Sequence, residues 1–261
     1  MSAKFSLTPQ QLDAFERDGV IRVPRFYSRD IIDTMADRVW EDLEQRFAMR
    51  RDQPQTWVGA SPGKFQGLRK IRAFAPMHSP ELHALADVLL GEGGWESVLG
   101  AGLLLTLPTP RPPLARPPWH LDIGGTERLD PLPILRIFTF LEAAPPGGGG
   151  TLYVERSHRL AIEIERANGG PVRSAQVRDR LKARHPWFAH LLTAGYEHLR
   201  GMMEVPAQVG GHPVRLREMT GAAGDLIIMH PAIMHGGAHN GSDRPRMMLT
   251  EWITRRTPAP A

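Results

Sequence analysis

From residue 102 onward the sequence consists of short apolar runs interrupted by proline and glycine, and this pattern constrains the fold more than any other feature. Short runs of this kind, bounded by turn-forming residues, are typical of β-strands. Many short strands with turn-rich links pack as a sandwich or a jelly-roll barrel. We therefore predict a mainly β core of the jelly-roll type within an α+β fold. The runs are LLLTLP, PILRIFTFLEA, GTLYVE, PVRLREM, DLIIMHP and RMMLTEWI.

The first hundred residues predict helices that pack outside this core. Thr8, followed by proline and then Gln11, has the pattern of a capping box, and Gly19 is a typical helix stop. The apolar run VIRVPRF then predicts a strand. A second helix with one apolar stripe follows Ser28, and a third begins at Ser79.

One segment breaks the β pattern of the second half. Residues 174–201 carry apolar side chains at helical spacing, and Pro186 divides the run in two. We predict a helical insertion between strands, and two roles stay open for it. It is either a packing layer or a lid that faces the substrate, since long insertions in compact β domains are often functional.

Length and composition indicate one globular domain. The chain has 261 residues, of which 41% are hydrophobic, enough to build a core. We expect a single domain over residues 1–261, with helical support in 1–100, a jelly-roll core in 101–256 and the helical insertion in 161–205.

The same composition excludes several classes of protein. No apolar run is long enough to span a membrane, and no secretion signal is recognisable at the N-terminus. The 32 basic and 28 acidic residues are interspersed along the chain, with a net charge of +4 and no nucleic-acid-binding motif. There is no cysteine, so a metal would be held by histidine, aspartate or glutamate. We expect a soluble cytoplasmic protein that binds neither membranes nor nucleic acid.

The stretch PWHLDIGG places His120 and Asp122 two residues apart. In a strand, residues at this spacing point to the same face, where both side chains can bind one cation. The motif alone is weak, because 11 histidines and 28 acidic residues in a chain of 261 give about one such pair by chance.

A second block, GDLIIMHPAIMHGGAHNGSDRPR at residues 224–246, offers three more histidines. Two imidazoles and one carboxylate with open coordination positions form the facial triad of non-haem Fe(II) oxygenases. His230 precedes a proline and marks a strand end, and His239 lies in an expected loop beyond two glycines. His235, anchored by apolar residues on one side, is the preferred third ligand.

Arg246 follows His235 by eleven residues. The cosubstrate 2-oxoglutarate would occupy two positions on such an iron, and its far carboxylate needs a cation. A guanidinium supplies a planar, permanently charged, two-pronged partner. The alternative is a surface ion pair between Arg246 and Asp243.

These motifs resemble the phytanoyl-CoA dioxygenase-like family of Fe(II)/2-oxoglutarate oxygenases. The similar segments are LTPQQLDAFERDGVIRVPRFYS, RKIRAF, WHLD, FTFLEAAPPGGGGTLYVERSHR and the 224–246 block, so the resemblance covers most of the chain. It implies a double-stranded β-helix. One departure is the stretch between ERSHR and GDLIIMHP, which is longer than the family pattern and affects the expected substrate side.

The resemblance also implies the site residues and cofactors. His120, Asp122 and His235 would bind Fe(II), and Arg246 would hold 2-oxoglutarate, with O2 as the second cosubstrate and ascorbate as reductant. Lys70, in an expected strand RKIRAF, and Phe138, in FTFLE, would also reach 2-oxoglutarate.

The implied reaction is hydroxylation of an aliphatic C–H bond of a small molecule, with release of succinate and CO2. Related halogenases lack the carboxylate of the triad, so Asp122 favours hydroxylation. Two alternatives stay open: another metal-dependent enzyme, such as an isomerase or hydrolase on a cupin-like barrel, and a non-catalytic small-molecule binding module. Trp187 and Phe188 in the insertion suggest apolar walls around the substrate, and Arg136 suggests contact with an anionic group. The sequence leaves the substrate and the oligomeric state open.

Overall fold

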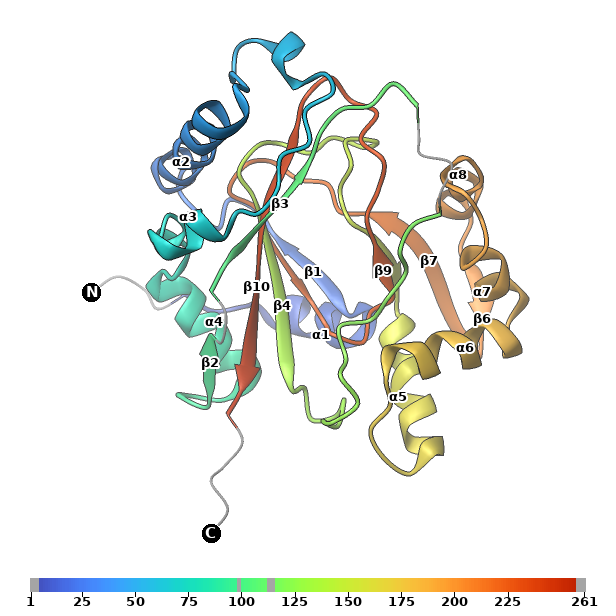
Figure 1. The fold of residues 1–261 in the computed structure, drawn as a ribbon. Coiled ribbons are helices and arrows are strands. Elements are labelled where there is room, and N and C mark those ends of the chain that lie inside the picture. The colour runs from blue at the N-terminus through green and yellow to red at the C-terminus, as the bar shows by residue number, and fades with distance from the viewer. Residues whose placement is uncertain (1–4, 98–99, 112–115, 257–261) are drawn as a thin grey trace.

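The computed structural model describes residues 5–97, 100–111 and 116–256. Two antiparallel sheets face each other, with helices on both outer sides (Figure 1). This is the predicted jelly-roll fold. None of the helices in these ranges combines the length and apolar character needed to cross a bilayer.

The N-terminal helices form as their capping signals predict. In α1 (Pro9–Asp18), Thr8 and Gln11 make the reciprocal capping box, and Gly19 ends the helix in the left-handed conformation. The helices α2 (Arg29–Phe47) and α4 (Pro80–Leu90) begin after the serine caps Ser28 and Ser79. Between them lie α3 (Gln66–Lys70) and two short 3₁₀ turns, Pro54–Trp57 and Ala75–Met77.

The larger sheet has the order β1-β8-β4-β10-β2, with β3 also paired to β10. Its outer face carries residues such as Leu135, Ile137 and Leu249, which pack with the N-terminal helices in one buried cluster. The alternate residues, such as Phe138 and Met248, face the interior between the sheets. The bounds are β1 (Val20–Val23), β2 (Trp95–Ser97), β3 (Gly102–Thr106), β4 (Ile134–Phe140), β8 (Leu226–Met229) and β10 (Arg246–Arg255).

The smaller sheet has the order β6-β7-β5-β9. Tyr153 packs toward the interior, whereas Leu152 and Val154 face outward. The bounds are β5 (Leu152–Glu155), β6 (Ala207–Val209), β7 (His212–Glu218) and β9 (His235–Gly236).

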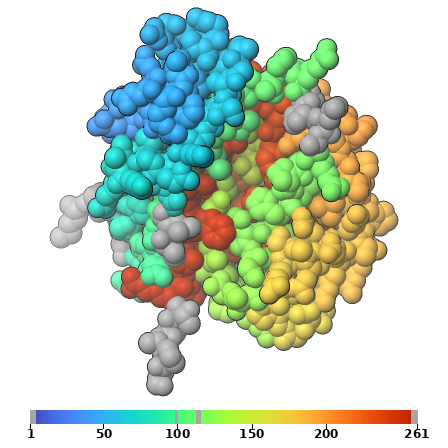
Figure 2. All heavy atoms as spheres, in the orientation of Figure 1, coloured from blue at the N-terminus to red at the C-terminus, as the bar shows by residue number. Residues whose placement is uncertain are grey.

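The predicted helical insertion covers the outer face of the smaller sheet. Within the predicted range lie α6 (Ser174–Arg184), α7 (Pro186–Leu191) and α8 (Tyr196–Glu204), with Pro186 opening α7 as expected. The helix α5 (Ser157–Asn168) precedes them and begins earlier than the predicted insertion. Phe188 and Leu199 are buried in one cluster with Val154 and Val214 of the sheet. In Figure 2 the N-terminal helices and this insertion stand on opposite sides, and the middle of the chain and the last strand lie between them.

Candidate metal centre

His120 and Asp122 lie on a segment that runs antiparallel to the 231–235 stretch. His120 exchanges two backbone hydrogen bonds with His235, and the amide of Asp122 donates to the carbonyl oxygen of Pro231 at 2.8 Å. The sequence suggested a strand here, but only an isolated bridge forms. The pairing still turns both side chains to one side, with His120 Nε2 lying 3.7 Å from Asp122 Oδ1.

His235, on β9, completes the cluster. Its Nε2 lies 3.5 Å from Asp122 Oδ2, and one potential ligand atom from each of His120, Asp122 and His235 lies within 4.8 Å of the others. His235 and Asp122 are buried, whereas the His120 side chain is 47% exposed. The cluster is therefore anchored in the protein and open on the side of His120.

The Nδ1 atoms of both histidines lie within hydrogen-bond distance of backbone carbonyl oxygens. Nδ1 of His120 lies 2.8 Å from the carbonyl oxygen of Pro118, and Nδ1 of His235 lies 3.0 Å from that of Ile233. A carbonyl oxygen only accepts, so each neutral ring carries its proton on Nδ1 and keeps the Nε2 lone pair for a metal. Burial lowers the pKa of His235 to about 4, which keeps this ring neutral at pH 7.

The donor set fits a divalent transition metal. Two neutral imidazole nitrogens and one carboxylate match the 2-His-1-carboxylate triad of non-haem iron sites. Asp122 Oδ2 is buried and accepts no hydrogen bond from a described residue. The Arg136 guanidinium lies beside this oxygen without donating a hydrogen bond to it. The oxygen therefore remains available to bind a metal ion between the two imidazoles.

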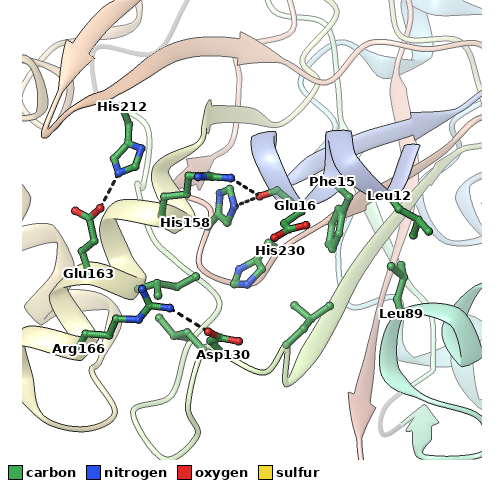
Figure 3. Close-up of a pocket in the computed structure, with 14 residues that line it drawn as sticks. Leu12, Phe15, Glu16, Leu89, Asp130, His158, Glu163, Arg166, His212 and His230 are labelled. Carbon is green, nitrogen blue, oxygen red and sulfur yellow. Dashed lines mark hydrogen bonds and ion pairs between the residues drawn. The ribbon is translucent and has the colours of Figure 1, made fainter. Parts of the chain in front are cut away.

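The other two histidines of the block do not join the cluster. His230 is buried; its Nδ1 accepts from the amide of Ala232, and its ring lies 5.1 Å from that of His158. Both rings line a separate cavity of about 480 Å³, shown in Figure 3. His239 Nε2 lies 2.9 Å from the carbonyl oxygen of Thr109. Within the described ranges, His235 is the histidine of the block that meets His120 and Asp122.

Arg136, on the interior face of β4, approaches the same carboxylate. Its Nε lies 3.0 Å from Asp122 Oδ2, and its guanidinium carbon lies 4.7 Å from the Trp252 ring centre and 5.4 Å from that of Phe138. Strand alternation placed Arg136 and Phe138 on one face. The ion pair with Asp122 and the contact with Trp252 were missed, because they depend on how β4 pairs with β10 and on the path of the 116–122 segment.

Arg246 opens β10 and is 6% exposed. Its Nε donates to the carbonyl oxygen of Gly149 at 2.8 Å, Nη1 to that of Leu104 at 3.2 Å, and Nη2 to Thr106 Oγ1 at 2.5 Å. Burial lowers the pKa of Arg246 to about 10, and the nearby carboxylate of Glu218 opposes that shift. The guanidinium stays charged at pH 7 in this buried place, so the surface ion pair considered for it is wrong.

The two remaining candidates differ in their surroundings. Phe138 is 2% exposed and lies in the interior cluster of the barrel. Lys70 is exposed at the end of α3. The strand expected for RKIRAF is wrong, because Leu68 is buried from a helical turn and Arg72 follows in the left-handed conformation. Its contact with 2-oxoglutarate stays a prediction that no described side-chain contact of Lys70 supports.

The chain matches known proteins along most of its length. The family model for phytanoyl-CoA dioxygenase (PhyH) matches residues 15–248. The L-proline trans-4-hydroxylase of Streptomyces griseoviridis is 27% identical over 150 residues, which is 55% of this chain and only half the length of that relative.

Solved structures share the fold at low sequence identity. The non-haem α-ketoglutarate-dependent carbocyclase SnoK from nogalamycin biosynthesis superposes with a TM-score of 0.59 at 18% identity, covering 96% of this chain and 85% of that one. HygX from Streptomyces hygroscopicus, solved with nickel and 2-oxoglutarate, gives a TM-score of 0.54 at 15% identity, covering 96% and 87%.

Proposed function

The chain belongs to the phytanoyl-CoA dioxygenase family, and from this premise we propose that it is an Fe(II)- and 2-oxoglutarate-dependent dioxygenase that hydroxylates an aliphatic C–H bond of a small molecule. The observation that carries the proposal is the convergence of His120, Asp122 and His235 within 4.8 Å, with a buried carboxylate oxygen that lacks a donor. The relative that acts on L-proline supports hydroxylation as the outcome.

Each residue of the triad has a defined part in this proposal. His120 and His235 would bind iron through Nε2, because their Nδ1 atoms are held by backbone carbonyls. Asp122 would supply the one anionic ligand. Bound iron with 2-oxoglutarate supplies the oxidising chemistry, in which O2 is consumed, succinate and CO2 are released and one oxygen atom enters the substrate.

Arg246 and Phe138 are the residues we assign to 2-oxoglutarate. Arg246 is a fixed cation, since three protein acceptors hold its guanidinium and two of its five N–H groups remain for a ligand. Phe138 contributes an apolar wall on the same interior face. Apolar walls exclude water, so a carboxylate that reaches Arg246 is bound more strongly there than at the surface.

The test is cosubstrate conversion. Protein supplied with Fe(II), ascorbate and O2 should convert 2-oxoglutarate to succinate, slowly alone and faster when a small-molecule substrate is added. An Asp122→Ala variant is the matched control and should release no succinate. Iron binding without succinate formation under any condition would contradict the proposal and favour a metal that acts as a Lewis acid, as in an isomerase or hydrolase.

A further inference from the structure

Arg136 and Arg246 both lie on interior-facing strand positions and differ in what their guanidinium groups contact. Arg246 donates hydrogen bonds to three protein acceptors. Arg136 donates no hydrogen bond within the described ranges: Asp122 Oδ2 lies 3.0 Å from its Nε, and this Nε is buried without an acceptor. A buried guanidinium donor without an acceptor is costly, and the two Nη groups remain available to a ligand. Arg136 is only 13% exposed at its side chain.

Aromatic rings hold Arg136 in this position. Its guanidinium lies over the ring of Trp252, the residue opposite it on β10, and near that of Phe138. Such stacking orients the planar group and reduces its freedom. The open edge of the guanidinium is therefore held beside the triad, ready for an acceptor.

The charges around Arg136 do not balance once a metal is bound. Asp122 is the carboxylate that lies beside Arg136, with its Oδ2 3.0 Å from Nε. The single charge of Asp122 would be shared with a divalent cation once the triad is loaded. Arg136 would then be a buried cation next to the reacting centre without an anion of its own.

We propose that Arg136 binds a carboxylate group of the substrate, so that the enzyme acts on small carboxylic acids. This inference rests on the proposed function. The two Nη groups form the fork that matches a carboxylate, and they lie on the strand face that lines the site. Both ends of 2-oxoglutarate have partners without Arg136, since one end binds the metal and the other is assigned to Arg246. The carboxylate at Arg136 is therefore that of the molecule to be oxidised.

The experiment measures binding without turnover. Protein loaded with Co(II) and 2-oxoglutarate is titrated by calorimetry with L-proline, benzoate and hexanoate, each compared with its neutral amide. At least one acid should bind about tenfold or more tightly than its amide, as a charge-assisted contact implies. In Arg136→Gln the preference should fall to within about twofold, and Arg136→Lys should lie between, because it keeps the charge and loses the fork.

Arg22 is the matched control. It is also a strand arginine, and its Nε lies 3.0 Å from Oδ2 of the buried Asp225, but its side chain is 47% exposed and, in the described part of the chain, makes no hydrogen bond or ion pair with the residues of the triad. Arg22→Gln should keep the preference for acids. Thermal unfolding and Co(II) affinity of each variant report on folding, and the preference of the unmodified protein is measured independently of any variant.

The inference is contradicted if no acid binds more tightly than its amide, or if Arg136→Gln retains the preference for acids. It is also contradicted if Arg136→Gln lowers the affinity for 2-oxoglutarate as much as Arg246→Lys does, because Arg136 would then bind the cosubstrate. Failure of the unmodified protein to bind Co(II) and 2-oxoglutarate would instead contradict the proposed function.

Discussion

His120 and His235 exchange a pair of backbone hydrogen bonds, each 2.9 Å from amide nitrogen to carbonyl oxygen. This bridge brings the two imidazole rings side by side, with ring centres 4.1 Å apart. Two segments far apart in sequence are thus joined by the main chain at the point where their side chains must meet. The pairing of the two histidines is therefore fixed by main-chain hydrogen bonds.

The cosubstrate assignment is tested by Arg246→Lys. Lysine keeps the charge and loses the two-pronged geometry, so binding of 2-oxoglutarate should weaken by about 1–3 kcal/mol. The measurement is the apparent Michaelis constant for 2-oxoglutarate. Urea unfolding shows how much stability the variant loses with the hydrogen bonds from Arg246 to Gly149 and Leu104. An unchanged Michaelis constant would exclude Arg246 from the cosubstrate site.

The insertion also supports the ligand-bearing segment. Ser174 Oγ, at the start of α6, accepts from the amide of Leu121 at 2.9 Å, and Arg178 Nη1 donates to the carbonyl oxygen of Trp119 at 2.9 Å. Ser174→Ala and Arg178→Gln should each weaken Fe(II) binding by about 1 kcal/mol, because they loosen the residues on both sides of His120.

Arg180 provides the control for that prediction. It lies on the same helix but bonds to Ile164 and Asn168, away from the triad. Arg180→Gln should leave the dissociation constant of Fe(II) unchanged. Equal losses in the variants of Arg178 and Arg180 would show a general effect on stability and no specific support of the metal site.

Whether the insertion is a lid is tested by limited proteolysis of residues 174–201. Its apolar residues, including Phe188 and Leu191, are buried against the smaller sheet, so cleavage requires local unfolding. We expect similar cleavage rates with and without iron, 2-oxoglutarate and substrate. Slower cleavage in the loaded protein would mean that the segment closes over the site.

Stability should fall in mild acid because of His158. This residue is 3% exposed, its Nε2 lies 3.1 Å from the carbonyl oxygen of Glu16, and burial lowers its pKa to about 4 (Figure 3). Its unfolded pKa is about 6.5, so between these values the unfolded state binds more protons. The stability is fully present above pH 6.5 and is lost as the pH falls toward 4, by about 1.4 kcal/mol per pH unit.

His158→Gln should remove the part of the pH dependence of the unfolding free energy that His158 contributes. The measurement is the free energy of unfolding in urea at pH 7 and pH 5, for the variant and for the unmodified protein. Burial also lowers the pKa of His230, to about 3, so part of the slope should persist in the variant. An identical pH dependence in both proteins would mean that His158 titrates normally in the folded state.

Local patterns predicted most of the fold. The capping box at Thr8, the stop at Gly19 and the alternation along β4 are decided by neighbouring residues, and the structure has all three. The strand expected at RKIRAF failed because a short run with few apolar residues fits a helical turn equally well. β9 has only two residues, and it forms through pairing with β5, which no local pattern encodes.

The candidate site also combines features predictable from local sequence with contacts that depend on long-range pairing. Sequence context and the resemblance to the family together indicated His120, Asp122 and His235. The ion pair of Arg136 with Asp122 and the support by Ser174 arise from segments that meet only in the folded chain. Periodicity gives the face on which a residue lies, whereas its partner depends on long-range register.

The central claim is that His120, Asp122 and His235 hold the iron, and Fe(II) titration of three variants tests it most directly. One Fe(II) per chain should bind to the unmodified protein and to His230→Ala, in which the triad is intact. His235→Ala and His120→Ala should lose stoichiometric binding and succinate formation together. Loss of iron from His230→Ala, with His235→Ala still binding it, would contradict the assignment.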